Sequence, residues 1–306
     1  MKISICIPTY NRPKLLMEAL NSCLSQTLKP FEIIIGDDSR NRATQEAVRK
    51  LKESMEDGGC IRYYKNPVSL GQAANVNTLI KRVKGDKMVL LHDDDLLLPW
   101  ALSVMAAAFK EDPGLGAVFG KQYIIDNEGK VDMDQSEENN RYFFRSSQYV
   151  NHPLSALESS VVQQFPNDSY MVDSQLAKQV KYRKKEAIGN AGDFDFGLRL
   201  AQSGTRFHYI DQYLSKYRVT PSSVARDGTD SGFRAYKIIS DSGVSQDNVY
   251  VNMVLKRKAP IAVSQAIAYG KRKEAMQIYF SKWHRGRILT LGGVRRFFML
   301  LRPPFN

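Results

Sequence analysis

Three consecutive carboxylates, Asp93, Asp94 and Asp95, follow a short apolar run at residues 88–91. Adjacent carboxylates repel one another unless a cation or hydrogen-bond donors compensate their charge. Mg²⁺ or Mn²⁺ binds carboxylate oxygens and leaves positions for water and substrate phosphates, so the triplet suits a metal–diphosphate site. A solvated loop in which Asp95 caps the next helix explains the triplet alone equally well. His92, directly before the triplet, is a candidate ligand or a partner of one.

Two other acidic positions suit related chemistry. Asp37 and Asp38 follow a second apolar run, where a carboxylate can accept a hydrogen bond from a uracil imide or from ribose hydroxyls. Asp193 lies near the start of a predicted helix, where a partly desolvated carboxylate can act as general base toward a sugar hydroxyl. Taken singly, an ordinary turn explains the pair and helix capping explains Asp193. The chain has neither of the glycine-rich motifs G-x-G-x-x-G and G-x-x-x-x-G-K-[S/T], which argues against dinucleotide-binding and P-loop sites.

The elements that carry these residues alternate between strand and helix patterns. Strand-like runs are predicted at residues 3–7, 31–35, 61–64 and 88–91, and helical spacing separates them at 13–24, 43–55 and 72–83. Asn11 is the predicted N-cap of the first helix. Four strand–helix units, the last completed by a predicted helix at residues 101–110, predict an α/β fold with a largely parallel sheet flanked by helices. Ligands of such sheets bind at the carboxyl ends of the strands, where the acidic residues lie.

Beyond Asp95 the pattern is mixed. We expect a helix at residues 101–110, a strand at 115–125 and a mobile polar loop at 126–140. A helical segment around residues 174–186 precedes Gly192-Asp193, and two short strands follow at 207–210 and 213–219. From about residue 231 the chain is helical and basic. These features predict one domain at residues 1–225 and a C-terminal extension at 226–306.

The composition adds limits on class and partner. With 306 residues, 43% of them hydrophobic, the chain can bury a large core and is not a disordered or fibrous protein. Cys6, Cys23 and Cys60 show no C-x-x-C spacing, so reduced thiols and a cytoplasmic location are expected. No apolar stretch of about 18 residues is present to span a bilayer.

The net charge of +12 is concentrated at one end. Residues 256–306 contain 12 of the 44 basic residues but one of the 32 acidic ones, so they carry +11 and leave +1 for residues 1–255. Aromatic and aliphatic residues such as Phe297 and Phe298 accompany this charge. The mixture fits an anionic membrane surface, and equally a solvated helical face or an oligomer contact. No nucleic-acid reading motif accompanies it, so nucleic acid is not an expected partner.

Several motifs, in this order, resemble those of family 2 glycosyltransferases. They are Ile3-Ser4-Ile5-Cys6-Ile7-Pro8-Thr9-Tyr10-Asn11-Arg12, Asp37-Asp38-Ser39, Gly71 with Asn75 and Asn77, His92-Asp93-Asp94-Asp95 with Pro99, and Gly192-Asp193. The similarity covers roughly residues 2–220. It implies a GT-A fold, a nucleotide-diphospho-sugar donor, foremost a UDP-sugar, a Mn²⁺ or Mg²⁺ cofactor, a DXD-type metal motif and inversion at the anomeric carbon.

The resemblance also implies roles for individual residues. Asp193 matches the catalytic base, and Asp94, supported by Asp95, matches the metal ligand. Contact with the donor nucleotide falls to Pro8, Thr9, Tyr10, Asp37, Asp38, Asn75 and Asp93. The family's metal motif often begins with Asp where this chain has His92. A late family histidine after a Tyr-Arg pair is replaced here by Thr220.

We therefore expect an inverting glycosyltransferase that acts on a glycan or lipid-linked acceptor in bacterial-type cell-surface polysaccharide synthesis. It would be cytoplasmic, or peripheral on the cytoplasmic face of the membrane. A catalytically silent, membrane-docked glycan-binding scaffold is an alternative, but it would not need Asp38, Asp94 and Asp193 together. A sugar-1-phosphate nucleotidyltransferase is another, but it would carry a glycine-rich, basic loop where this chain has residues 8–12.

Overall fold

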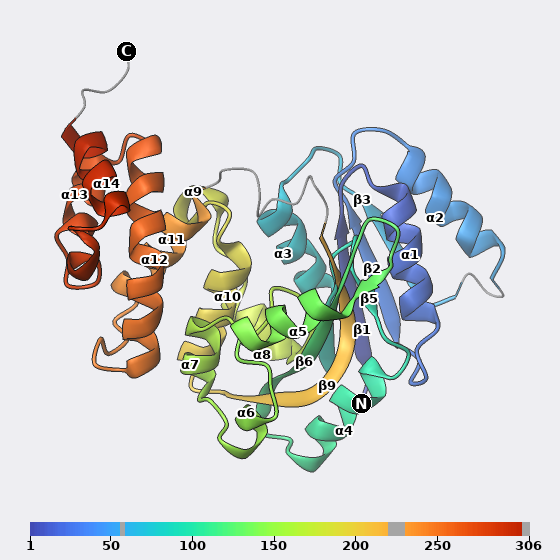
Figure 1. Cartoon of the computed structure of the whole chain (residues 1–306). Coiled ribbons are helices and arrows are strands. Elements are labelled where there is room, and N and C mark those ends of the chain that lie inside the picture. The colour runs from blue at the N-terminus through green and yellow to red at the C-terminus, as the bar shows by residue number, and fades with distance from the viewer. Residues whose placement is uncertain (56–58, 220–229, 302–306) are drawn as a thin grey trace. The chain divides into compact units, whose positions relative to one another are not determined.

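The computed structural model describes residues 1–55, 59–219 and 230–301 (Figure 1). The chain divides into two compact units. The first comprises Met1–Lys184 and Phe196–Thr220, and the second comprises Lys185–Asp195 and Pro221–Asn306. The predicted domain boundary at residues 225 and 226 lies outside the described residues, so the domain limits stay a prediction.

The first unit is built on a nine-stranded sheet, counted over the described residues, in the order β3-β2-β1-β4-β8-β6-β9-β5, with β7 paired to β6. Its first four strands are mutually parallel: β1 (Ile3–Thr9), β2 (Glu32–Asp37), β3 (Ile61–Lys65) and β4 (Lys87–Leu90). The remaining strands are β5 (Leu96–Leu97), β6 (Leu115–Ile125), β7 (Val131–Asp132), β8 (Tyr170–Asp173) and β9 (Arg206–Arg218). Pairing there is mixed, because β6 and β9 are parallel whereas β8 is antiparallel to both β4 and β6.

Strand alternation distributes the core over both faces of this sheet. Ile3, Ile5 and Ile7 face one side, where they pack with α1 (Pro13–Leu24), α2 (Ala43–Glu53) and α4 (Ala101–Glu111). Cys6 and Ile34 face the other side, with α3 (Gln72–Arg82), α8 (Ser174–Val180) and the later part of α10 (Gly192–Gln202). In Figure 1, α1 and α2 lie on one side of β1–β3 and α3 on the other. The predicted α/β fold is confirmed.

Some local predictions were wrong. The predicted mobile loop at 126–140 contains β7 and most of α5 (Met133–Tyr142). The two short strands predicted at 207–219 form the single strand β9. Asn11 does not cap the first helix: Arg12 holds that position without a side-chain cap, and Pro13 begins the helix as expected. The helix predicted around 174–186 is interrupted after Val180 and resumes as α9 (Lys185–Ile188).

The other described helices of the first unit are α6 (Gln148–Asn151) and α7 (Ala156–Val161). The second unit is helical in its described part, as expected from the sequence. Besides α9 and the first residues of α10, it contains α11 (Ser231–Asp241), α12 (Val249–Ala268), α13 (Arg272–Tyr279), a 3₁₀ turn at Arg285–Arg287 and α14 (Leu291–Leu301). Its core centres on the buried face of α12, which includes Val254, Leu255 and Val263.

Cys6, Cys23 and Cys60 are free thiols.

Candidate active site

The parallel pairing of β1 with β4 brings Thr9 and Asp93 together at the carboxyl ends of these strands. Thr9 Oγ1 donates a 2.6 Å hydrogen bond to Asp93 Oδ2, and the Tyr10 amide lies 3.4 Å from the same oxygen. Burial raises the pKa of Asp93, and the bond from Thr9 opposes that rise. Pro8, the preceding residue of β1, pairs with Gly36 of β2. The end of β1 thus fixes the first carboxylate of the triplet.

Arg12 is the positive charge of this cluster. Its Nη1 lies 2.8 Å from Asp94 Oδ2 and 3.4 Å from Asp93 Oδ1. About a third of its side chain is exposed, so the guanidinium stands at the mouth of the site. Sequence reasoning did not select Arg12, although it ends the same motif as Thr9. The sequence feature that could have identified Arg12 is its position just after β1, because the neighbouring strand β4 is followed by three aspartates.

Asp95 is the most deeply buried member of the triplet. Its Oδ1 accepts a 2.7 Å hydrogen bond from the Arg218 amide. Burial raises the pKa of Asp95 well above its ordinary value, and the carboxyls of Asp168 and Asp94 add to the rise. Asp95 Oδ2 and Asp168 Oδ1 are buried and accept no hydrogen bond from the described residues. Two such carboxyls together require a shared proton or a cation.

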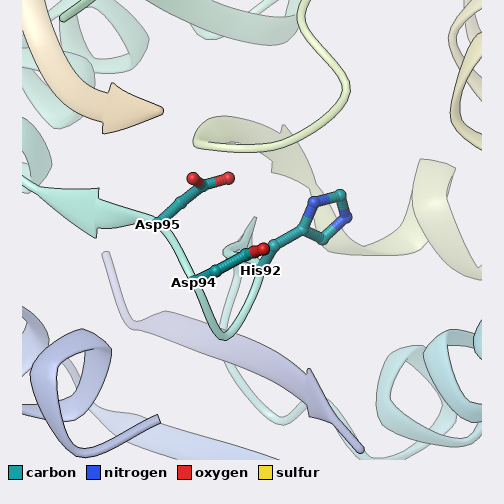
Figure 2. A group of neighbouring side chains, drawn as sticks. All are labelled: His92, Asp94 and Asp95. Carbon is teal, nitrogen blue, oxygen red and sulfur yellow. The ribbon is translucent and has the colours of Figure 1, made fainter. Parts of the chain in front are cut away.

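His92, Asp94 and Asp95 form a group that could hold a metal ion, because one ligand atom from each lies within 4.8 Å of the others. Figure 2 shows that all three project from one short loop, with Asp95 at the start of β5. The buried Oδ2 of Asp95 accepts no hydrogen bond from the described residues and is available to a ligand. Asp94 forms an ion pair with Arg12. The residues therefore fit a divalent cation that binds oxygen ligands.

Asp37 and Asp38 lie at the end of β2 and are both buried. Asp37 accepts hydrogen bonds from Tyr63 Oη (2.5 Å) and from the Ser39 amide (2.8 Å). Asp38 accepts from Asn66 Nδ2 (2.6 Å) and from the Gly71 amide (2.8 Å), while its own amide donates to the Thr9 carbonyl. Asp38 thus joins the end of β1 to the loop that precedes α3.

The two asparagines of α3 contact protein groups. Asn75 is buried, donates to the Gly36 carbonyl (2.8 Å) and accepts from Asn66 Nδ2 (3.1 Å). Asn77 exchanges hydrogen bonds with both the amide and the carbonyl of Tyr182. Asn75 therefore stabilises the turn after β2, and Asn77 binds the backbone of the segment after α8.

Two residues of the first unit, Asp168 and Arg218, contact the acidic loop from distant parts of the sequence. Asp168 Oδ2 accepts from the His92 amide at 3.0 Å, and the Arg218 guanidinium donates to the Asp94 carbonyl at 2.9 Å and forms an ion pair with Glu18. Asp168 was not predicted, because no local motif marks it. Arg218 belongs to the Tyr-Arg pair of the family motif but was given no role. Asp193 is the second residue of α10, as predicted near a helix start, and belongs to the second unit.

Comparison with known proteins adds to this geometry. The profile of glycosyl transferase family 2 matches residues 4–160, slightly more than half of the chain, and includes the ends of β1, β2 and β4. The chain belongs to this family. Its members are glycosyltransferases, so the predicted enzyme class and the predicted family are confirmed at this level.

Two relatives named as glycosyltransferases are similar to this chain in sequence. An uncharacterised glycosyltransferase of Methanocaldococcus jannaschii is 29% identical over 224 residues, which are 71% of this chain and 70% of the relative. A GalNAc(5)-diNAcBac-PP-undecaprenol β-1,3-glucosyltransferase of Campylobacter jejuni is 34% identical over 136 residues, or 44% of this chain and 42% of the relative. The family 2 chain thus spans less than half of this second relative.

Solved structures show the same fold for this family 2 chain. Residues 1–349 of S. aureus TarS in complex with UDP-GlcNAc give a TM-score of 0.63 at 16% identity, covering 98% of this chain and 81% of that one. The mannosyltransferase PcManGT of Pyrobaculum calidifontis, in complex with GDP-Man and Mn²⁺, gives a TM-score of 0.59 at 14% identity. The match covers 98% of this chain and 87% of PcManGT. The predicted GT-A fold is thereby confirmed. Within its described residues, the chain has no helix both long and apolar enough to cross a membrane.

Proposed function

We propose that this family 2 chain transfers a sugar, with inversion, from a nucleotide-diphospho-sugar to a hydroxyl of a glycan or lipid-linked acceptor. The observation that carries the proposal is the hydrogen-bonded acidic cluster at the carboxyl ends of β1 and β4. There Thr9 holds Asp93, and Arg12 faces both Asp93 and Asp94. Cationic and metal-binding groups at a strand end are what a diphosphate leaving group requires.

The nucleotide side of the site is assigned to the ends of β1 and β2. Pro8 and Thr9 of β1, with Tyr10 directly after it, are assigned to one wall of the proposed nucleotide site, and Asp93 is assigned to accept hydrogen bonds from ribose hydroxyls. Asp37 and Asp38 hold the turn after β2, and Asn75 supports it through Gly36 and Asn66. In this assignment the two aspartates and Asn75 shape the base site mainly by fixing its backbone.

Asp94 and Asp95, with His92 beside them, would hold Mn²⁺ or Mg²⁺. When bound, the ion supplies positive charge to the diphosphate as it leaves. The chain's own residues keep this charge in place: the Arg218 amide orients Asp95, and Asp168 fixes the His92 amide. The Mn²⁺ in the PcManGT complex supports a metal requirement for this chain.

Asp193 is proposed as the catalytic base. Removal of the acceptor proton by a carboxylate permits attack on the anomeric carbon from the face opposite the leaving group, and a single displacement inverts that carbon. Asp193 lies in the first turn of α10, where the helix dipole interacts favourably with a negative charge. An ionised carboxylate is the form that can accept the proton.

The comparisons support a UDP-sugar donor and a lipid-linked acceptor. TarS binds UDP-GlcNAc, and the C. jejuni relative is named as a glucosyltransferase for an undecaprenol-linked saccharide. PcManGT binds GDP-Man, so a test of the donor nucleotide must include GDP-sugars as well as UDP-sugars. Cell-surface polysaccharide synthesis is the process in which these specificities would operate.

A donor screen tests the proposal. Each of a panel of UDP- and GDP-sugars is incubated with the protein and Mn²⁺, with and without saccharide and undecaprenol-linked acceptors, and released nucleoside diphosphate is measured. We expect acceptor-dependent release of one diphosphate, lost with EDTA and in Asp94→Asn. Donor binding without turnover for any acceptor supports a silent scaffold, and pyrophosphate release from a nucleoside triphosphate and a sugar 1-phosphate supports a nucleotidyltransferase.

A further inference from the structure

Helix α14 carries a continuous apolar stripe on its exposed side. Leu291, Val294, Phe298 and Leu301 are spaced at i, i+3, i+7 and i+10, which places them along one face of a helix. Their exposed fractions are 93%, 42%, 59% and 60%. Leu289, just before the helix, is 94% exposed. Single exposed leucines are ordinary, whereas a contiguous apolar stripe marks an interaction surface.

The opposite face of α14 fixes the orientation of this stripe. Gly293 and Leu300 are buried, and the Gly293 carbonyl accepts a 3.1 Å hydrogen bond from Tyr279 Oη of α13. A Cβ at Gly293 would overlap the carbonyls of Arg287 and Ile288, so the helix packs closely on the preceding turn. The exposed side chains are therefore held outward by a packed helix.

Basic residues lie next to the stripe on α14 and in the turn that precedes it. Arg295 follows Val294 on the exposed side of α14, and Arg285 and Arg287 of the 3₁₀ turn are also exposed. Residues 271–301 contain eight basic residues and one acidic residue, Glu274. Among the described arginines of this segment, none forms an ion pair with a carboxylate within 4.0 Å in the described structure. Uncompensated positive charge beside apolar side chains is the pattern of a helix that lies in a membrane interface.

We propose that α14 and the 3₁₀ turn dock the protein on an anionic lipid surface. Leu289, Leu291 and Phe298 enter the acyl boundary, and Arg285, Arg287 and Arg295 contact the phosphates of the headgroups. A second protein copy would match the apolar stripe but would meet the same positive charge on its partner. An anionic bilayer satisfies both features, and this inference does not depend on the proposed sugar transfer.

Sedimentation with lipid vesicles tests the docking surface. The full chain is mixed with vesicles of phosphatidylglycerol and phosphatidylcholine, or of phosphatidylcholine alone, and the bound fraction is measured at low and high salt. We expect binding to the anionic vesicles that weakens with salt. Leu291→Ser/Phe298→Ser and Arg285→Gln/Arg287→Gln/Arg295→Gln should each lower the partition coefficient about tenfold or more.

Matched controls change similar side chains elsewhere. Val68→Ser/Val150→Ser removes exposed apolar groups, and Lys14→Gln/Lys50→Gln/Lys110→Gln removes three exposed charges. Both should bind like the original protein. Circular dichroism and melting temperature establish that each variant folds. Absence of vesicle binding, equal loss in the controls, or a protein dimer that Leu291→Ser/Phe298→Ser converts to a monomer in ultracentrifugation would overturn the proposal.

Discussion

Arg12 contacts Asp94 and Asp93, the same carboxylates that are proposed to meet a metal ion and a ribose. A guanidinium cannot leave the protein, so it competes with any free cation for Asp94. Its partial exposure leaves it able to turn toward a phosphate once a donor enters. In the proposed function, the same residue would oppose metal binding before the donor arrives and favour the diphosphate afterwards.

Arg12→Gln is expected to bind Mn²⁺ about fivefold more tightly in the absence of donor, the equivalent of about 1 kcal/mol for a partly exposed ion pair. Nucleoside diphosphate binding should weaken at the same time, because a positive charge is lost. Calorimetric titration measures both affinities. Arg49→Gln, whose side chain pairs with Glu53 on the surface of α2, is the control. Weaker Mn²⁺ binding in Arg12→Gln would show that Arg12 does not compete for the site.

Asp193→Asn is expected to lower the turnover rate at least about a hundredfold, or about 3 kcal/mol of transition-state stabilisation, because the amide cannot accept the acceptor proton. Donor affinity should stay the same, since the role assigned to Asp193 concerns the acceptor. Steady-state rates and calorimetric donor titration separate the two effects, and the melting temperature controls for folding. Turnover near that of the original protein would remove Asp193 from the role of base.

At the level of the elements, the turn after β2 depends on close packing against α3. Gly36 precedes Asp37, and a Cβ at this position would lie less than 3.0 Å from Asn75 Oδ1. The Asn75 side chain donates through Nδ2 to the Gly36 carbonyl and accepts through Oδ1 from Asn66 Nδ2. Asn66 Nδ2 also donates to Asp38. The absence of a side chain at Gly36 therefore lets α3 approach β2 and hold the acidic turn.

Gly36→Ala should destabilise the fold by about 1–3 kcal/mol through overpacking and weaken donor binding by displacing the turn. Gly286→Ala, where an added Cβ meets no atom within 4 Å, is the matched control and should change neither property. Chemical unfolding and donor titration provide the two measurements. A Gly36→Ala protein of full stability would show that the β2–α3 contact adapts readily.

His284 connects the helices of the second unit. It is buried, its Nδ1 lies 3.1 Å from the Tyr279 carbonyl and its Nε2 accepts from Arg296 Nε. These partners require a neutral ring with the proton on Nδ1. Burial lowers the pKa of His284, and the charge of Arg296 lowers it further.

Because the unfolded His284 binds a proton more readily than the folded one, stability should fall as the pH drops below about 6.5 toward the lowered folded value. Above that range its contribution is fully present. His284→Gln should lose this part of the pH dependence, whereas His208→Gln, at an exposed position, should retain it. Thermal unfolding at a series of pH values measures the difference. Identical pH profiles for the original protein and His284→Gln would contradict the assignment.

The elements of the first 110 residues were predictable because their apolar periodicity is strong. Residues 126–140 were not, because the buried face of α5 is polar. Ser136 accepts from the Ile124 amide, and Asn140 donates to the Gln122 carbonyl, so this helix binds β6 through hydrogen bonds. Asp132 caps it. No apolar repeat marks such a helix in the sequence.

The candidate site divides in the same way. The acidic residues at the ends of β2 and β4, and Thr9 at the end of β1, were identified from local motifs. Asp168, just before β8, and Arg218, the last residue of β9, reach the same place, and their contribution depends on the order of strands in the sheet. Sequence spacing carries no signal for contacts of that kind.

At the scale of the whole molecule, the positive charge is distributed unevenly between the N-terminal region and the C-terminal residues 256–306. The proposed catalytic cluster is acidic and lies in the nearly neutral N-terminal region, while the surplus of positive charge lies in residues 256–306. On the docking proposal above, the net charge would relate to where the protein resides more than to the reaction it performs.

The initial rate with a lipid-linked acceptor should be higher when the acceptor is held in anionic vesicles than in neutral ones. Salt at about 0.5 M should remove most of the difference, because it screens attraction to the membrane surface. The rate with a water-soluble saccharide acceptor should not respond to vesicles. Parallel assays with both acceptors test this, and equal rates on anionic and neutral vesicles would contradict it.

Arg218 also has a consequence for how the first unit folds. Its amide binds Asp95, 123 positions earlier, and its guanidinium reaches Glu18, 200 positions earlier. These contacts form only after β9, the last strand of the sheet, has been added, and contacts of such long range are slow to form. We therefore expect the acidic loop to reach its final shape late in folding, and the Mn²⁺ affinity of the proposed metal group to appear during refolding only once the sheet is complete.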